Sequence, residues 1–205
     1  MIRAVILDLC DTVVRAAGHH ELLRLPGLGE RWDARQLDAW FQATPEYFAY
    51  ERGQIDTDTF LRCCCEGLGA RVSSEQFAEA YQNLVLHEIP GMADLVARLA
   101  GAFPLYALSN NNPLLWQAVR RVSPSVGLFR RVFLSHETGH LKPEPAAYEH
   151  ALTGIGLGLR EVVLVDDSRT SVARARSMGL SAIRFSSPGQ ALCELRDHIR
   201  YANVY

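Results

Sequence analysis

Short apolar runs alternate with segments of helical periodicity along much of the chain. The runs lie at residues 2–7, 104–108, 132–134, 162–165 and 182–185. Most of them carry few charged residues, which is typical of strands that are covered on both faces of a sheet. Strands that alternate with helices in this way predict a parallel α/β sheet with right-handed crossover connections.

The segments between these runs contain helix signals. One helical face shows the i, i+3, i+4, i+7 spacing and is formed by Met92, Leu95, Val96 and Leu99. Gly101 is placed to end this helix. Because proline suits the first helical turn, further helices are expected near Pro113 and near Pro143 and Pro145. Another is expected over residues 168–178, closed by Gly179.

The segment from residue 14 to residue 88 breaks the alternation, because it contains helix signals and no convincing strand. Asp33 and Asp56 are candidate N-caps, and Ser73 with Gln76 fits a capping box. Apolar residues at helical spacing follow each of these sites. We therefore expect a helical bundle, inserted after the first strand and placed over the ligand-binding edge of the sheet. Residues 1–13 and 89–205 then form the core domain, and residues 14–88 form the inserted helical domain.

Composition and charge exclude several classes of protein. The chain has 205 residues, of which 48% are hydrophobic, and a net charge of −2, so a folded globular protein is expected rather than a disordered one. The near-neutral balance predicts no binding to nucleic acid or to an anionic membrane surface. No apolar run approaches the roughly 20 residues that cross a bilayer. The first apolar run is short and is followed at once by the acidic Asp8, so no signal peptide is expected.

The cysteine pattern indicates a reducing compartment. The five cysteines are odd in number and three are adjacent: Cys10, Cys63, Cys64, Cys65 and Cys193. A disulfide framework is therefore not expected, and we expect a cytoplasmic protein.

Polar residues follow four of the predicted strands at the points where the strands end. They are Asp8, Cys10, Asp11 and Thr12 after the first run, Ser109 and Asn110 after the second, Lys142 beyond the third, and Asp166 and Asp167 after the fourth. Ligands of open α/β sheets bind beyond the carboxyl ends of the strands. We therefore expect these side chains to meet at one edge of the sheet.

The chemistry of this set indicates a phosphate group and a divalent cation. Carboxylates that lie close together repel each other and have raised pKa values unless a cation is present. Mg²⁺ is the natural partner, because it takes oxygen ligands and few protein contacts. Ser109 and Lys142 can hold the oxygens of a bound phosphate, and a carboxylate can serve as the nucleophile.

The four strand-end segments resemble the motifs of the haloacid dehalogenase (HAD) superfamily, in the same order and spacing. They are Asp8 to Thr12, Ser109-Asn110, Lys142-Pro143 and Asp166-Asp167. The helical insertion resembles the C1 cap of that family. The segment Tyr50-Glu51-Arg52-Gly53 is similar to a segment of one branch of the family. This branch contains α-glucose-1-phosphate phosphatase-like proteins and the N-terminal phosphatase domain of epoxide hydrolases. The resemblance implies a Rossmann-like parallel core with an inserted α-helical cap.

The resemblance also implies which residues bind the metal. Asp8 would be both the nucleophile and a metal ligand, and the backbone carbonyl of Cys10 would be a second ligand. Asp167 would bind Mg²⁺ directly, and Asp166 would bind it directly or through water.

The remaining motif residues are implied to hold the substrate. Ser109, Asn110 and Lys142 would hold the transferring phosphoryl group, and Thr12 would support the first loop. The expected reaction is Mg²⁺-dependent hydrolysis of a small phosphorylated metabolite through an aspartyl-phosphate intermediate. The protein is expected to act as a monomer or a homodimer, without nucleic acid or membrane partners.

Cys10 departs from the family pattern, which has Asp at this position as the general acid and base. An unperturbed thiol has a pKa of about 8.5, and neighbouring carboxylates raise it. Proton transfer contributes roughly 10²–10⁴ in rate, so we expect reduced activity and a preference for good leaving groups. Asp11 is adjacent, but Thr12 anchors the register and the Asp11 side chain is expected to point away.

Two alternative functions remain open. One is a catalytically degraded protein that binds phosphate or a metabolite in the same pocket without turnover. The other is a 2-haloacid dehalogenase, which the resemblance describes as having Tyr in the place of Cys10 and no metal. The pair Asp166-Asp167 favours the phosphatase, because two adjacent acids make sense mainly beside a cation.

Overall fold

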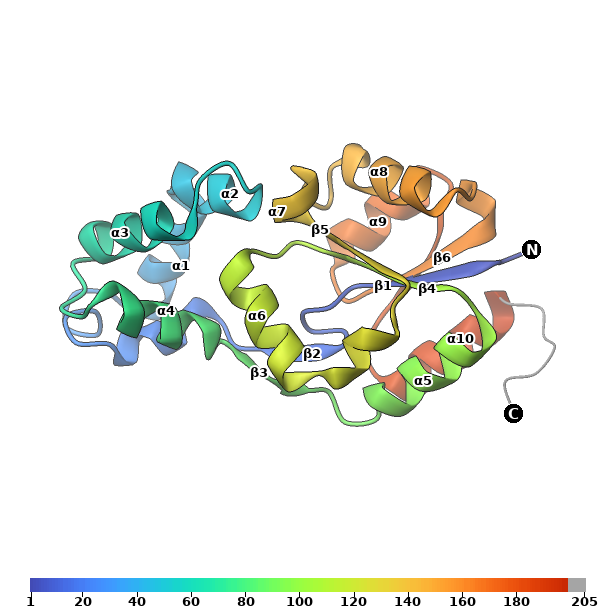
Figure 1. Ribbon diagram of the computed structural model, residues 1–205, viewed down its shortest axis with the longest axis horizontal. Coiled ribbons are helices and arrows are strands. Elements are labelled where there is room, and N and C mark those ends of the chain that lie inside the picture. The colour runs from blue at the N-terminus through green and yellow to red at the C-terminus, as the bar shows by residue number, and fades with distance from the viewer. Residues whose placement is uncertain (199–205) are drawn as a thin grey trace.

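One parallel sheet forms the centre of the computed structural model, which describes residues 1–198 of the chain (Figure 1). Its strands are β1 (Ala4–Leu7), β4 (Leu105–Ser109), β5 (Arg131–Leu134), β6 (Val162–Asp166) and β7 (Ser181–Arg184). Their order across the sheet is β5-β4-β1-β6-β7, and every neighbouring pair is parallel. The five apolar runs of the sequence are these strands, so the predicted α/β fold with a parallel sheet is confirmed.

The register of the central strands aligns their carboxyl ends. Leu7 of β1 is paired with Ala107 of β4 on one side and with Val165 of β6 on the other. Asp8, Ser109 and Asp166 therefore lie at the same edge of the sheet, as the order of the apolar runs predicted.

Helices cover both faces of this sheet (Figure 1). On one face, α5 (Met92–Ala102), α6 (Pro113–Val122) and α10 (Pro188–His198) pack around a hydrophobic core that includes Val5 and Leu7. On the other, α8 (Pro145–Ile155) and α9 (Arg169–Ser177) pack on Ala4 and Ile6. Alternate residues of β1 thus pack into the hydrophobic cores on opposite faces of the sheet, and all four of its residues are buried. Shorter elements connect the layers: η2 (Pro124–Leu128), α7 (Ser135–Thr138) and η3 (Leu159–Glu161).

The predicted helix starts agree with the structure, and one predicted helix end does not. α6 and α8 begin at proline, and Ser168 caps α9. Gly101 does not end α5, because that helix continues to Ala102 and the N–H of Phe103 still bonds to the carbonyl of Leu99 at 2.8 Å. The helix ends where Phe103, with a φ of −140° and a ψ of 152°, takes an extended conformation before Pro104.

The segment between β1 and α5 forms a helical bundle at one end of the molecule (Figure 1). Its elements are η1 (His19–Arg24), α1 (Ala34–Ala43), α2 (Pro45–Glu51), α3 (Thr57–Leu68) and α4 (Ser74–Gln82). The bundle has its own core, in which Tyr50, Phe60 and Tyr81 are fully buried. Capping boxes at Asp33 and Ser73, together with the Asp56 cap, are present as the sequence predicted.

The expectation that residues 14–88 contain no strand is wrong. β2 (Val14–Ala16) and β3 (Val85–Glu88) pair antiparallel where the insertion leaves and rejoins the core, with Val14 opposite Glu88. Each strand is too short to show a period, and its partner is far away in sequence. This ribbon connects the helical insertion to the sheet. The proposed boundaries, residues 1–13 with 89–205 and residues 14–88, therefore stay a prediction, and residues 199–205 lie outside the described part.

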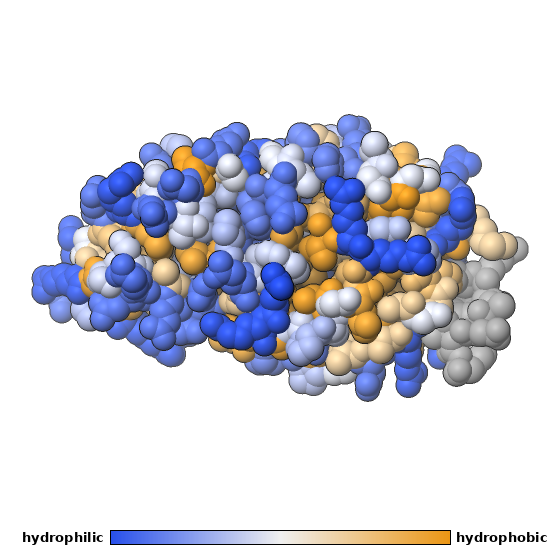
Figure 2. All heavy atoms as spheres, viewed as in Figure 1, coloured by the Kyte–Doolittle hydropathy of each residue, from blue (hydrophilic) through white to orange (hydrophobic). Residues whose placement is uncertain are grey.

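The surface carries few large exposed hydrophobic side chains. Among the described residues these are Met1, Phe48, Leu86 and Leu128. In the view of Figure 2, hydrophilic residues cover most of the helical insertion, and hydrophobic residues gather in patches over the core. No helix of the described part is long and apolar enough to cross a membrane.

Candidate active site

The loop after β1 turns sharply and presents Asp8 and Cys10 at the sheet edge. The carbonyl of Leu9 accepts from the N–H groups of Val13 at 2.7 Å and Val14 at 2.9 Å, which closes a tight turn. Asp11 has a φ of +57° in this turn. Its carboxylate accepts a hydrogen bond from Arg15 at 2.9 Å, so the side chain is held at the outer rim of the site. This geometry gives Asp11 a partner of its own, away from the carboxylate of Asp8.

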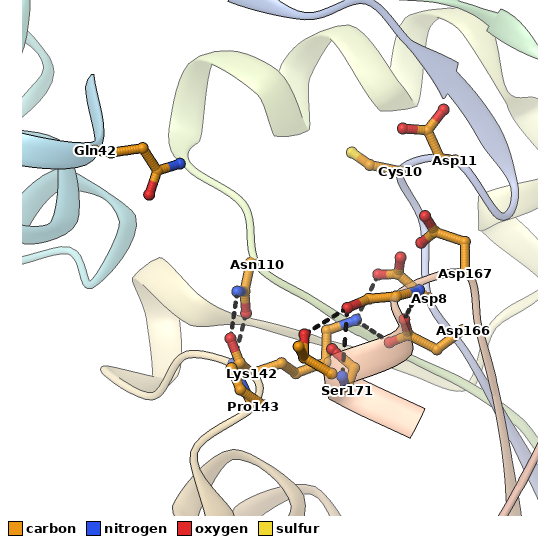
Figure 3. Close-up of a pocket in the computed structure, with 12 residues that line it drawn as sticks. Asp8, Cys10, Asp11, Gln42, Asn110, Lys142, Pro143, Asp166, Asp167 and Ser171 are labelled. Atoms are coloured by element: carbon orange, nitrogen blue, oxygen red, sulfur yellow. Dashed lines mark hydrogen bonds and ion pairs between the residues drawn. The ribbon is translucent and has the colours of Figure 1, made fainter. Parts of the chain in front are cut away.

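Lys142 is the centre of the charge arrangement (Figure 3). Its Nζ donates to Asp8 Oδ1 at 2.7 Å and to Asp166 Oδ2 at 2.6 Å. All three side chains are buried, with at most 8% of any side chain exposed. Lys142 is also the single lysine of the chain, whose other basic residues are arginines and histidines. An ammonium is a compact charge with three donors, which suits a position between two carboxylates.

Burial and mutual repulsion change the pKa values of these groups. Burial, reinforced by Asp166 and Asp167, raises the pKa of Asp8 to about 7, although Lys142 acts in the opposite direction. Burial alone would lower the pKa of Lys142, but Asp8 and Asp166 outweigh it and the net shift is upward. The pKa of Asp167 is raised by burial and by Asp166. The three carboxylates of the site therefore carry more negative charge than the single positive charge of Lys142 neutralises.

This excess of carboxylate oxygens fits a small divalent cation. Asp8, Asp166 and Asp167 each offer a carboxylate oxygen within 4.8 Å of the others. Asp166 is already engaged at both oxygens, by Lys142 and by the N–H of Ser168 at 2.8 Å. Asp167 is half-buried and borders the same cavity, so Asp8 and Asp167 are the freer ligands. Oxygen ligands in this number are those that Mg²⁺ prefers.

The end of β4 supports the loop that carries Lys142. The amide of Asn110 donates to the carbonyl of Lys142 at 2.8 Å and accepts from its N–H at 2.7 Å. Ser109 is buried, and its hydroxyl donates to the carbonyl of Asn110 at 3.3 Å. In this arrangement Asn110 fixes the position of Lys142, and its predicted contact with a phosphoryl group stays a prediction, as does that of Ser109.

The thiol of Cys10 faces the cavity (Figure 3). Burial, and then the neighbouring acids Asp8 and Glu51, raise the pKa of this thiol well above its usual range. The thiol therefore keeps its proton at neutral pH. It is a poor proton donor to an alkoxide and a poor base toward water.

The helical insertion contributes residues that lie outside the four strand-end motifs. Gln42 of α1 faces the cavity from the side opposite Asp166 and Asp167 (Figure 3). Glu51, at the end of α2, is buried and accepts from the amide of Asn112 at 2.5 Å. Burial raises the pKa of Glu51 to about 7. The segment Tyr50-Glu51-Arg52-Gly53 was the available signal for Glu51, whereas nothing in the local pattern marked Gln42.

These residues surround a cavity of about 520 Å³ at the sheet edge. Asp8, Cys10, Asn110, Lys142, Asp166 and Asp167 line it, together with Asp11, Gln42 and the first turn of α9. The structure thus brings together residues from all four predicted strand ends. Ser109 and Thr12 lie behind this lining, fully buried.

A parallel α/β core with a nucleophile-like aspartate, a buried lysine and an acidic pair defines a hydrolase of the HAD type. The family model of haloacid dehalogenase-like hydrolases matches residues 2–179. The chain belongs to this family.

Individual relatives are distant. A D-ribitol-5-phosphate phosphatase from Bacteroides thetaiotaomicron is 21% identical over 190 residues, which cover 90% of this chain and 92% of the relative. The drimenol cyclase drtB of Aspergillus calidoustus is 26% identical over 199 residues, and the match spans only 34% of that longer protein. A HAD family enzyme from B. thetaiotaomicron, solved with magnesium and inorganic phosphate, superposes with a TM-score of 0.79 at 22% identity, covering 91% of this chain and 95% of that one. This structural likeness supports the fold.

Proposed function

We propose that the protein is a Mg²⁺-dependent phosphatase that hydrolyses a small phosphomonoester through an aspartyl-phosphate on Asp8. The observation that carries this proposal is the placement of Lys142 between Asp8 and Asp166, beside the free carboxylate of Asp167. That arrangement places three carboxylates around one lysine, so a further cation is needed to balance their charge. A phosphatase and a magnesium–phosphate complex among the relatives agree with it.

The two steps follow from the positions of these side chains. A carboxylate oxygen of Asp8 attacks phosphorus, the bond from phosphorus to the ester oxygen breaks, and the alcohol leaves as its anion, which takes a proton from solvent. Water then attacks phosphorus, the bond to Asp8 breaks, and inorganic phosphate and the free carboxylate are released. Lys142 stabilises the negative charge on the transferring group in both steps. When bound, Mg²⁺ supplies further charge neutralisation, with Asp8, Asp167, the Cys10 carbonyl and, directly or through water, Asp166 as its ligands.

Cys10 sets the expected limit of this activity. Its protonated thiol does not supply the acid that a poor leaving group needs, so esters of acidic alcohols are favoured. The same residue is the observation behind a second candidate function, the binding of a phosphorylated metabolite without turnover.

The test measures phosphate released from p-nitrophenyl phosphate and a panel of phosphorylated metabolites, with Mg²⁺ or with a chelator. The wild type, Asp8→Asn and Cys10→Asp are compared. Turnover that needs metal and is lost in Asp8→Asn supports the phosphatase. A silent wild type with an active Cys10→Asp supports the binding function, and chelator-insensitive halide release from a 2-haloacid would overturn both.

A further inference from the structure

A second cavity, of about 350 Å³, opens from the phosphoryl site into the interface between the helical insertion and the core. The two cavities share Cys10, Gln42, Asn110 and Lys142, so they adjoin each other beside the lysine. A group bonded to a phosphoryl unit at Asp8 would extend into this second space, which we call the alcohol chamber. Its volume exceeds the ~150 Å³ of an apolar cavity that holds benzene.

Apolar and aromatic side chains form much of the chamber wall. Tyr47 and Phe48 come from α2, Leu115 from α6, and Leu141 from the segment before Lys142. Phe48 is 37% exposed and borders the chamber. A flat apolar group in the chamber would cover this ring and remove its own surface from water.

The polar groups at the chamber are largely paired with protein partners. The amide of Asn110 is bonded on both sides to the main chain of Lys142. Glu51 accepts from Asn112, and its carboxyl group contributes the acidic side chain of the wall. Gln42 at the mouth and the hydroxyl of Tyr47 are left as polar contacts, so the chamber offers few partners to a molecule with many hydroxyl groups.

The two arginines nearest in sequence to these walls are also engaged. Arg52, next to Glu51, pairs with Glu144 and donates to the carbonyl of Gly139 at 2.9 Å. Arg15 pairs with Asp11 at 2.9 Å. Among the described residues that line the chamber, Lys142 is the only cation, and it faces Asp8 and Asp166. A second anionic group on the substrate would therefore meet Glu51 and no free cation.

From these walls we infer that the alcohol chamber selects phosphomonoesters of uncharged, apolar alcohols, aromatic ones above all. It disfavours polyol phosphates and substrates that carry a carboxylate or a second phosphate. This inference rests on the proposed phosphatase function, because it assigns the part of the substrate that the phosphoryl site does not hold. It also agrees with Cys10, since aryl alcohols are better leaving groups than alkyl alcohols.

The test uses phosphonates, whose carbon–phosphorus bond is not cleaved, so binding is read without turnover. Affinities for methylphosphonate, benzylphosphonate, phosphonoacetate and 2,3-dihydroxypropylphosphonate are measured by calorimetry with Mg²⁺ present. We expect benzylphosphonate to bind at least about tenfold more tightly than methylphosphonate, because it buries the ring in the chamber. Phosphonoacetate and the dihydroxy compound are expected to show no such gain.

Phe48→Ala tests the contribution of the chamber independently of the phosphoryl site. It should remove most of the gain for benzylphosphonate and leave methylphosphonate affinity unchanged, and Phe48→Leu should retain part of the gain. Leu128→Ala, at an exposed position of the core domain, is the matched control and should change neither affinity. If methylphosphonate binds but benzylphosphonate gains nothing, or if a charged or polyol phosphonate binds best, the chamber assignment is wrong while the phosphoryl site stands. If none of the four binds, the proposed function fails and the inference fails with it.

Discussion

The guanidinium of Arg52, in the helical insertion, is paired with the carboxylate of Glu144, two residues beyond Lys142 in the core. The backbone of Gly53 also approaches the core, and a Cβ there would lie 2.0 Å from the carbonyl oxygen of His136. The insertion therefore contacts the segment that carries Lys142 on both sides of the lysine. Its docking and the position of the Lys142 charge are linked by this short stretch.

Gly53→Ala should disturb this docking more than an ordinary substitution at a turn. Gly53 has a φ of +66° and meets backbone atoms of His136, so an added methyl group carries both conformational strain and a clash. We expect a loss of about 2 kcal/mol or more in the free energy of unfolding, measured in urea, and a fall in phosphatase activity. Gly139→Ala is the matched control, because Gly139 has a φ of +78° and no atom within 4 Å of an added Cβ. Equal losses in the two variants would remove the docking contact from the explanation.

The Arg52–Glu144 pair itself should be worth little in stability. Glu144 is 42% exposed in its side chain, and pairs of this kind contribute about 0.2–1 kcal/mol. A double-mutant cycle with Arg52→Gln and Glu144→Gln should give a coupling energy in that range, decreasing with salt. The exposed pair Arg3–Glu161 serves as the control and should show a smaller coupling. A coupling above about 2 kcal/mol would show that the pair is more strongly coupled than its exposure indicates.

Lys142→Met should destabilise the metal-free protein strongly. The substitution leaves Asp8 and Asp166 buried without their cation, and removal of one partner from such a group costs about 3–5 kcal/mol. Added Mg²⁺ should restore part of the loss, because it neutralises the same carboxylates. Urea unfolding at pH 8 with and without Mg²⁺ measures both effects, and Arg35→Met on the exposed surface of α1 is the control. Since Lys142 is the single lysine, selective lysine labelling gives one side-chain NMR signal, which should shift on addition of Mg²⁺.

Glu51 should make the protein less stable as the pH rises. The pKa of Glu51 is raised from 4.5 to about 7 by burial, so between these values the folded state binds more protons than the unfolded state. The free energy of unfolding therefore decreases from about pH 4.5 upward, and the full cost of roughly 3 kcal/mol is present above pH 7. Glu51→Gln should remove this dependence and stabilise the protein at pH 8. Thermal unfolding from pH 5 to pH 8 is the measurement, with exposed Glu79→Gln as the control. A wild-type profile that Glu51→Gln leaves unchanged would contradict the raised pKa.

The sequence predicted the sheet and the meeting of four strand ends because both depend on local patterns. A buried parallel strand is a short apolar run, and Asp8, Lys142 and Asp166 each follow such a run at an edge that the topology shares. The ribbon of β2 and β3 was missed, since Val14 and Glu88 pair across the whole insertion. The bonds from Asn110 to the main chain of Lys142 were also beyond reach, because they depend on how two loops approach each other. Side chains such as Gln42 enter the site only through the docking of the insertion.

Cys10→Asp should change the dependence of the reaction on the leaving group. The wild type has Asp8 and Lys142 in place but holds a protonated thiol where the proposed reaction needs an acid, so aryl phosphates should be hydrolysed much faster than alkyl phosphates. An aspartate at this position supplies the proton, and general acid catalysis contributes roughly 10²–10⁴ in rate. The gain in kcat should therefore be large for an alkyl phosphate and small for p-nitrophenyl phosphate, whose leaving group needs no proton.

Cys10→Asn, which has a similar shape and no acidic proton, is the control for this comparison and should show no gain with either substrate. The slope of log kcat against the pKa of the leaving alcohol summarises the result: steep in the wild type and in Cys10→Asn, shallow in Cys10→Asp. A wild type that hydrolyses alkyl and aryl phosphates at similar rates would mean that another group already supplies the proton. The buried carboxyl group of Glu51 would then be the first residue to substitute, because it lines the alcohol chamber with Cys10.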